Sequence, residues 1–408
     1  MSQTATNRGM ARNVALYPWF KFFQNLIFWQ SVWFLFFQQE LSASEALLLY
    51  VVYDVATTAL EVPSGYMSDR LGRKRTLVAA MVAGLIGLVL LATADSFAIF
   101  ALGQICIGAG AAFASGTDTA FLYESLVADG RGGEMEAQTT RAWQFTLTGL
   151  ALSAVTGGLM AGVAYELAFG AAAVALGCAG LMALRFTEPP HADGDKVGLG
   201  AQWGLLRTAL RQPVLLWLFV LSVVMYGFSH VPFVFGQPFI AQAMQAGGWQ
   251  GDAPIVSGAV SAAMMVVSVL ASLVALRLRR RIGLPAILLL AFGMQIGLIG
   301  VLALTDSAIA IAVLLLRMVP DSWTYPFIEA RVQPLLSDAG RATFLSLQSF
   351  AGRLLFAGSI FAASLIAPTT GTMAYADIRA TLAWYAVAGL VVFGGLLLAS
   401  RRVEIEKP

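Results

Sequence analysis

Long apolar stretches alternate with short polar segments along all 408 residues of the chain. A helix rises about 1.5 Å per residue, so about 20 apolar residues cross the hydrocarbon core of a membrane, which is about 30 Å thick. Twelve such stretches can be placed, at 14–37, 45–66, 76–94, 97–120, 139–162, 165–184, 213–239, 254–276, 284–304, 307–330, 342–366 and 378–400. The pattern predicts an all-α membrane protein with twelve transmembrane helices.

The composition agrees with a membrane protein and argues against an enzyme. Hydrophobic residues make up 58% of the chain and charged residues 12%, far from the balance of a soluble domain. Cys106 and Cys178 both fall within apolar stretches, and the two histidines are too few for a metal cluster. No glycine-rich phosphate loop ends in a lysine. We therefore predict no cofactor, no metal, no nucleic-acid partner and no use of ATP.

Basic residues gather on one side of this predicted topology. Most of the 25 Lys and Arg residues precede the first stretch, join even-numbered stretches to odd-numbered ones, or follow the last. By the positive-inside rule, both termini are then cytoplasmic. The first apolar stretch is full length without a small-residue cleavage site, so we expect it to remain as a spanning helix. The short loops favour a bacterial inner membrane, and we expect a monomer surrounded by membrane lipid.

The chain divides into two similar halves. Six stretches precede the polar segment 188–212 and six follow it, which predicts a six-helix bundle at 1–187, a cytoplasmic linker and a second bundle at 213–408. The basic loop 277–283 lies between stretches 8 and 9. It occupies the position in the second half that the charged loop 65–77 occupies in the first. The chain is therefore interpreted as a degenerate repeat.

The loop 65–77 carries the most specific motif. It reads Gly-Tyr-Met-Ser-Asp-Arg-Leu-Gly-Arg-Lys-Arg-Thr-Leu. This resembles the loop between helices 2 and 3 of the major facilitator superfamily, G-x-L-A-D-R-x-G-R-K-x-x-L, with Met67 and Ser68 as the departures. The resemblance implies two six-helix repeats, a substrate path between them, and secondary transport of a small molecule by alternating access.

The same resemblance implies that the loop locks one state of the transport cycle by holding the second and eleventh helices together. Opposite charges at the inner ends of the stretches would complete an inside gate. The predicted gate residues are Glu61, Gly65, Asp69, Arg70, Gly72, Arg73, Asp118, Glu124 and Glu329.

Polar residues inside the apolar stretches mark a second region. A charge at the bilayer centre costs about 2.5–3.5 kcal/mol on insertion scales, so such residues should face a wet cavity or one another. They recur at helical spacing and form stripes. The predicted substrate or ion site consists of Lys21, Asn25, Asp54, Tyr226, His230, Arg317, Asp321 and Arg353. Stretches 3, 6, 9 and 12 have almost no ionisable groups and are expected to face lipid.

Structural roles for these residues stay open beside the functional ones. Lys21 has Asp54 as an alternative partner, and Arg317 has Asp321 four residues away on the same helix. Arg353 binds an anionic substrate, takes part in a proton-controlled ion pair, or simply pairs with Asp321. His230 is either a proton acceptor or a hydrogen-bonded structural histidine.

Two further segments bear on direction. The segment 149–158 resembles the antiporter motif G-x-x-x-G-P-x-x-G-G, with Ser153 and Ala154 as departures, although small residues also serve close helix packing. Gln104 stands where drug–proton antiporters commonly carry an arginine. Proton-coupled efflux of small organic compounds is the leading interpretation. The alternatives are an organic-anion permease or exchanger that uses Lys21, Arg317 and Arg353, and a lipid flippase or non-transporting sensor.

Overall fold

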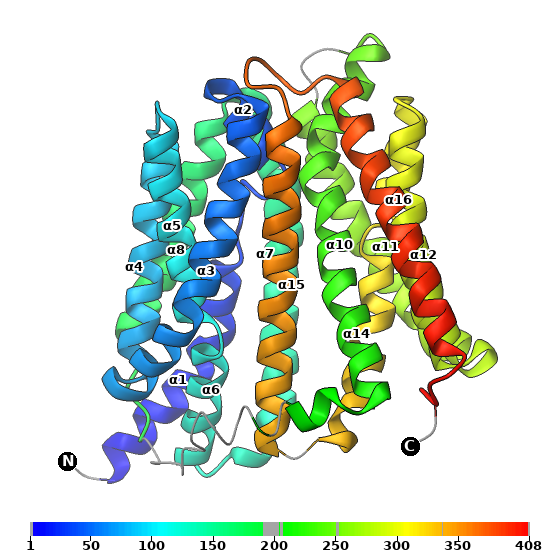
Figure 1. Ribbon diagram of the computed structural model, residues 1–408. Coiled ribbons are helices and arrows are strands. Elements are labelled where there is room, and N and C mark those ends of the chain that lie inside the picture. The colour runs from blue at the N-terminus through cyan, green and yellow to red at the C-terminus, as the bar shows by residue number, and fades with distance from the viewer. Residues whose placement is uncertain (1–2, 191–203, 205–206, 250–252, 337, 407–408) are drawn as a thin grey trace. The chain divides into compact units, whose positions relative to one another are not determined.

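The computed structural model describes residues 3–190, 204, 207–249, 253–336 and 338–406. All regular secondary structure in this part of the chain is helical (Figure 1). The first helices are α1 (Gln3–Gln24), α2 (Trp33–Glu40), α3 (Ala43–Leu71), α4 (Arg73–Ala92), α5 (Phe97–Ala114), α6 (Thr117–Ala128), η1 (Gly132–Glu134), α7 (Met135–Val163) and α8 (Tyr165–Arg185). The others are α10 (Pro213–Ala246), α11 (Ala253–Ile282), α12 (Leu284–Leu304), η2 (Ala308–Ala310), α13 (Ile311–Leu314), α14 (Val319–Val332), η3 (Gln333–Leu335), α15 (Asp338–Ile366) and α16 (Tyr375–Ser400).

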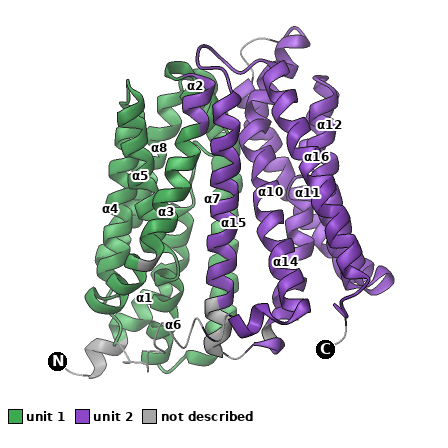
Figure 2. Ribbon diagram, viewed as in Figure 1, with its two compact units in different colours: residues 1–41, 48–194 green, residues 42–47, 195–408 purple. Residues whose placement is uncertain are grey.

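The helices form two compact units, which Figure 2 distinguishes by colour. Unit 1 comprises residues 1–41 and 48–194, and unit 2 comprises residues 42–47 and 195–408. Residues 191–203 and 205–206 of the predicted linker lie outside the described residues.

Eleven helices in the described part of the chain are long and apolar enough to cross a membrane. They coincide with stretches 2 to 12 of the sequence prediction, and α12 has the predicted bounds, 284–304. The first stretch, 14–37, is wrong as a continuous helix. It consists of α1 and α2, which are joined by the non-helical segment 25–32.

Two other predicted spans are interrupted as well. Residues 115–116 separate α5 from α6, and Gly116 has a φ of 71°, in the left-handed region that glycine tolerates best. Residues 315–318 separate α13 from α14, two residues before Pro320. Proline lacks the backbone N–H that an uninterrupted helix would use. These breaks place irregular backbone beside Asp118 in unit 1 and at Arg317 in unit 2.

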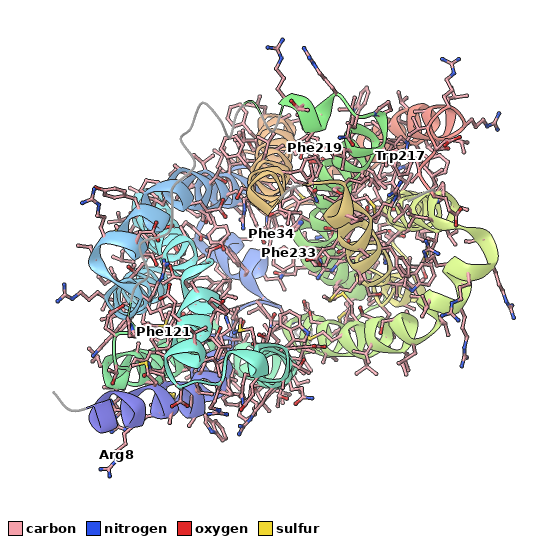
Figure 3. All side chains as sticks on the ribbon, turned by 90° about the horizontal axis from the view of Figure 1, so that it is seen from below. Arg8, Phe34, Phe121, Trp217, Phe219 and Phe233 are labelled. Carbon is pink, nitrogen blue, oxygen red and sulfur yellow. The ribbon has the colours of Figure 1, made fainter. Side chains whose placement is uncertain are left out.

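Aromatic side chains fill the core of unit 1. Phe121, which Figure 3 labels on α6, packs against Phe186 with ring centroids 4.5 Å apart, and Phe20 of α1 packs against the same ring at 5.5 Å. Glycines bring α4 and α5 together, because a methyl group on Gly87 would lie 2.8 Å from the Gly103 carbonyl oxygen. Such close backbone approach is typical of membrane helices.

The burial of the helices corrects one sequence expectation. In its most apolar 18-residue window, α12 is 61% buried inside the protein, whereas α11 is only 11% buried. The absence of ionisable residues from α12 therefore does not mark it as a lipid-facing helix. It marks a helix packed on several sides by other helices of unit 2, among them α14 and α16.

Candidate functional site

A cavity of about 340 Å³ lies inside unit 1. Residues of α1, α3, α4, α5, α6, α8 and the non-helical segment 25–32 line it, so the break in the first span opens directly onto it. The wall is largely apolar, with aromatic contributions from Phe23, Trp29 and Tyr53. Its polar side chains include Lys21, Gln24, Asn25, Ser115 and Asp118. A cavity of this size, with few polar groups in an apolar wall, is typical of a small-molecule site.

Lys21 and Asp118 form an ion pair in the wall of this cavity. Lys21 Nζ lies 2.7 Å from Asp118 Oδ2 and donates a second hydrogen bond to Gln24 Oε1 at 2.9 Å. The two side chains are 20% and 13% exposed. Asp118 lies in the first turn of α6, where the helix dipole favours a negative charge. The alternative pairing of Lys21 with Asp54 is wrong, because the carboxylate that Lys21 contacts comes from α6.

Side-chain contacts and glycines of α7 support the non-helical segment 25–32, which interrupts the first span. Asn25 Nδ2 donates to the Lys21 carbonyl at 2.7 Å and so caps the end of α1. A methyl group on Gly149 would lie 2.8 Å from the Phe22 carbonyl oxygen, and one on Gly157 would collide with the Phe28 backbone. The small residues of the segment 149–158 therefore accommodate irregular backbone.

Unit 2 holds a second polar cluster, at the break between α13 and α14. Arg317 donates to the Ser229 carbonyl at 3.3 Å, and its guanidinium lies 5.5 Å from the centre of the Phe233 ring, which Figure 3 labels. Asp321 accepts a hydrogen bond from Gln295 Nε2 at 3.1 Å. Within the described residues, no ion pair shorter than 4.0 Å joins Arg317 to Asp321. Their predicted direct neutralisation is therefore not found.

His230 is hydrogen-bonded on its own helix. Its Nδ1 lies 2.7 Å from the Tyr226 carbonyl oxygen. A carbonyl only accepts, so in this contact Nδ1 carries the hydrogen and Nε2 is left as the acceptor of the neutral ring. The imidazole also packs on the Tyr226 ring, with centroids 4.3 Å apart, and on Phe356, at 5.2 Å. These contacts agree with a structural histidine.

The sequence pattern of the Major Facilitator Superfamily matches residues 19–357. The chain belongs to this superfamily. No curated protein matches its sequence.

Solved structures agree with the major facilitator fold. The nucleoside transporter NupG has a TM-score of 0.73 at 16% identity, over 95% of this chain and 99% of that one. The peptide transporter POT in complex with sulfate has a TM-score of 0.72 at 13% identity, over 98% of each chain. A bacterial homolog to the human lysosomal transporter Spinster has a TM-score of 0.68 at 16% identity, over 98% of each chain. At these identities the likeness shows the fold, and this major facilitator is a multi-pass membrane transporter rather than an enzyme.

The charged loop of this major facilitator is tied to α6. The Arg73 guanidinium lies 3.0 Å from both Asp69 and Glu124 and donates to Ser68 Oγ at 2.7 Å. Glu188, beyond the end of α8, accepts hydrogen bonds from the backbone N–H groups of Arg73 at 2.6 Å and Lys74 at 3.1 Å. The network joins α3, α4 and α6 to the segment that follows α8.

The other predicted residues lie on several helices. Asp54 is 4% exposed on α3 and belongs to unit 1, whereas Arg353 lies on α15 in unit 2. Among the predicted gate residues, Arg70 stacks on the Tyr66 ring at 5.3 Å, and a Cβ added to Gly65 would meet open space. The predicted gate also includes Glu61 on α3, Gly72 immediately before α4 and Glu329 on α14. Their roles in substrate binding and gating stay predictions.

Two residues that organise unit 1 were missed. Asn13 is completely buried and pairs with the Thr187 backbone through both its amide atoms, at 2.7 and 2.8 Å. Glu188 caps α4 from a position more than 100 residues away. No local pattern distinguishes Asn13 from the other polar residues of α1, and nothing in the sequence indicates what it contacts.

Proposed function

We propose that this major facilitator exports small amphipathic organic solutes in exchange for protons, and that the unit 1 cavity forms part of its substrate site. The observation that carries the proposal is the combination of an ion pair, Lys21–Asp118, with aromatic and aliphatic side chains in one cavity wall. Apolar surface favours the body of the solute, and the few polar groups orient it.

The position of the pair supports a role in proton coupling. Lys21 lies in the last turn of α1 and Asp118 in the first turn of α6, so each flanks a break in a membrane span. When Asp118 takes up a proton, its carboxylate becomes a neutral carboxyl and its attraction to the Lys21 ammonium disappears. Protonation thereby acts on two interrupted spans at once. A proton enters as the solute leaves, and the ion pair re-forms when the proton is released.

The test is transport in proteoliposomes under an imposed pH gradient. We would follow tetraphenylphosphonium and ethidium as cationic probes, with a pH-sensitive dye inside the vesicles to follow proton movement. Wild type should couple probe flux to proton flux. Asp118→Asn should abolish gradient-driven flux while keeping exchange of labelled for unlabelled probe. The matched control is Asp95→Asn, which removes an exposed carboxylate between α4 and α5. Gradient-driven flux that survives Asp118→Asn would contradict the proposal.

An organic-anion permease is the second candidate, and Arg317 favours it. Its guanidinium contacts a carbonyl, a methionine sulfur and an aromatic face, and within the described residues it forms no ion pair. An arginine of this kind retains positive charge for an anionic solute. Benzoate uptake that is lost in Arg317→Gln but kept in Arg379→Gln, an exposed position on α16, would move the assignment to this class.

We further propose that the chain works as a monomer in a bacterial inner membrane, with both termini in the cytoplasm. The distribution of basic residues along the sequence supports this orientation. Labelling of single cysteines placed near Arg8 and Arg402 with a membrane-impermeant reagent tests it. Labelling of either site in intact cells would contradict the orientation.

A further inference from the structure

A second cavity, of about 780 Å³, lies at the end of unit 1 that carries the charged loop. Four cationic side chains line it: Arg12 from α1, Lys74 and Arg75 from the start of α4, and Arg185 from the end of α8. One carboxylate, Glu188, faces them. Three separate helices thus converge on one basic cavity, at the side predicted to face the cytoplasm.

The positive charge of this cavity is only weakly compensated within unit 1. Glu188 is already engaged with the N-terminus of α4, since its carboxylate accepts from the backbone N–H groups of Arg73 and Lys74. Arg12 donates to Thr187 Oγ1, a neutral partner, at 3.1 Å. Among the described residues, none of the four cations forms an ion pair within 4.0 Å. The cavity therefore suits a ligand that carries negative charge.

The cavity also opens onto apolar surface. Leu71 and Leu184 line it beside the cations and are 50% and 57% exposed. Along α8 the exposed side continues through Leu181, at 63%, and Val174, at 70%. Val174, Leu181 and Leu184 are spaced by seven and then three residues. This spacing places the three side chains within about 100° of one another around the axis of α8.

The neighbouring helix repeats the pattern. Arg75, Val82, Ile86 and Val89 fall at spacings of seven, four and three residues, which places them on one stripe of α4. The three apolar members are each about half exposed. Since α4 packs against α8, a cationic end and an apolar flank occur on both helices of the pair.

We propose that this cavity binds an anionic phospholipid. Arg12, Lys74, Arg75 and Arg185 hold the phosphate headgroup, and the acyl chains run along the exposed stripes of α4 and α8. A diffusible phosphate would use the cations alone, whereas only a lipid would also use the adjoining apolar stripes. The bound headgroup sits beside the capped start of α4, next to the Arg73 network.

The test is lipid binding to the full-length protein in detergent, measured by native mass spectrometry and by thermal shift. The ligands are dioleoyl phosphatidylglycerol, dioleoyl phosphatidylcholine, glycerophosphoglycerol as the headgroup without acyl chains, and inorganic phosphate. Phosphatidylglycerol should bind most tightly and raise the melting temperature, and its affinity should fall with added salt. Equal binding of both lipids to wild type, or equal stabilisation by glycerophosphoglycerol or phosphate, would overturn the proposal.

The decisive variant is Arg75→Gln/Arg185→Gln. Each basic residue near anionic lipid contributes about 1 kcal/mol, and 1.4 kcal/mol is tenfold in affinity, so the affinity for phosphatidylglycerol should fall roughly thirtyfold. The matched control is Arg280→Gln/Arg281→Gln, which removes two exposed charges from the corresponding loop of unit 2. An equal loss in the control would assign the effect to net charge and overturn the proposal. Should the first variant fail to fold, the lipid preference and salt dependence of wild type still decide.

Discussion

The two units differ in the contacts of a partly buried cation. In unit 1, Lys21 contacts a carboxylate at 2.7 Å, in the wall of a cavity. In unit 2, Arg317 contacts a carbonyl, a sulfur and an aromatic ring, while Asp321, four residues on, bonds to Gln295 instead. Both cations lie next to an interrupted helix. Similar helix interruptions in the two units are therefore accompanied by different contacts: an ion pair in unit 1, and in unit 2 an arginine in contact with neutral groups.

The largest effect is expected from breaking the pair in unit 1. Removing one member of a buried ion pair costs about 3–5 kcal/mol, and the partial exposure of this pair lowers the expectation for Lys21→Leu to about 2–3 kcal/mol. The double variant Lys21→Leu/Asp118→Leu should recover most of that loss, because no uncompensated charge remains. Thermal unfolding of the four proteins of this double-mutant cycle in detergent measures the effect. Additive losses would show that the two residues act independently.

The next effect concerns the support of the break in unit 1. Gly157→Ala places a methyl group against the Phe28 backbone, so α7 and the segment 25–32 must separate. Overpacking of this kind costs about 1–3 kcal/mol. Gly170→Ala, which meets open space on α8, is the control and should be neutral or slightly stabilising. Comparison of the two melting temperatures checks the expectation, and equal values would mean that the break is not held by this contact.

A smaller effect should appear at the N-terminal ends of α4 in unit 1 and α12 in unit 2, which follow glycines of similar conformation. Gly72 and Gly283 precede α4 and α12 with φ values of 101° and 84°. In each case a carboxylate fills the space of a side chain, Glu188 in unit 1 and Glu406 in unit 2, about 2.6–2.7 Å from an added Cβ. We expect Gly72→Ala and Gly283→Ala to cost about 1–2 kcal/mol each. Gly65→Ala, with open space around it, serves as the reference. A loss of stability in only one of the two variants would show that Gly72 and Gly283 do not have equivalent roles.

The smallest change in stability is expected at Arg317. Among the described residues no carboxylate contacts the partly buried Arg317 within 4.0 Å, and an ionised group without such a contact is costly to bury, so Arg317→Leu should shift stability by less than about 1 kcal/mol. Its stability relative to Lys21→Leu is the direct test of the comparison. A loss as large as that of Lys21→Leu would show that Arg317 is structurally compensated after all.

The sequence predicts the course of the helices far better than their interruptions. Each span is encoded locally by about 20 apolar residues, which is why stretch 9 matches α12 at both ends. The segment 25–32 remains apolar enough, with Leu26, Ile27 and Trp29, to be read as helix. Its irregular backbone depends on contacts with α7, more than 100 residues away. No local pattern contains that information.

The same distinction holds for the candidate site: the sequence predicts its charged residues but not their partners. Lys21 and Arg317 were identified because a charge in an apolar stretch is conspicuous and costly. The partner of Lys21 was not, because Asp118 lies 97 residues away and six other carboxylates, at 40, 45, 54, 61, 69 and 95, are nearer in the chain. Membrane-embedded charges can thus be found from the sequence, whereas their pairing depends on tertiary packing.

The interrupted first span also bears on how the chain enters the membrane during synthesis. The first stretch is not among the eleven helices that are long and apolar enough to cross a membrane, and it carries Lys21 in its first half. A translocon that scores each segment by its own hydrophobicity would give this one a weak insertion signal. Its stable placement should therefore wait until α6 is made and Asp118 neutralises the lysine. This segment would thus settle in the bilayer after α3 and α4, although it precedes both of them in the chain.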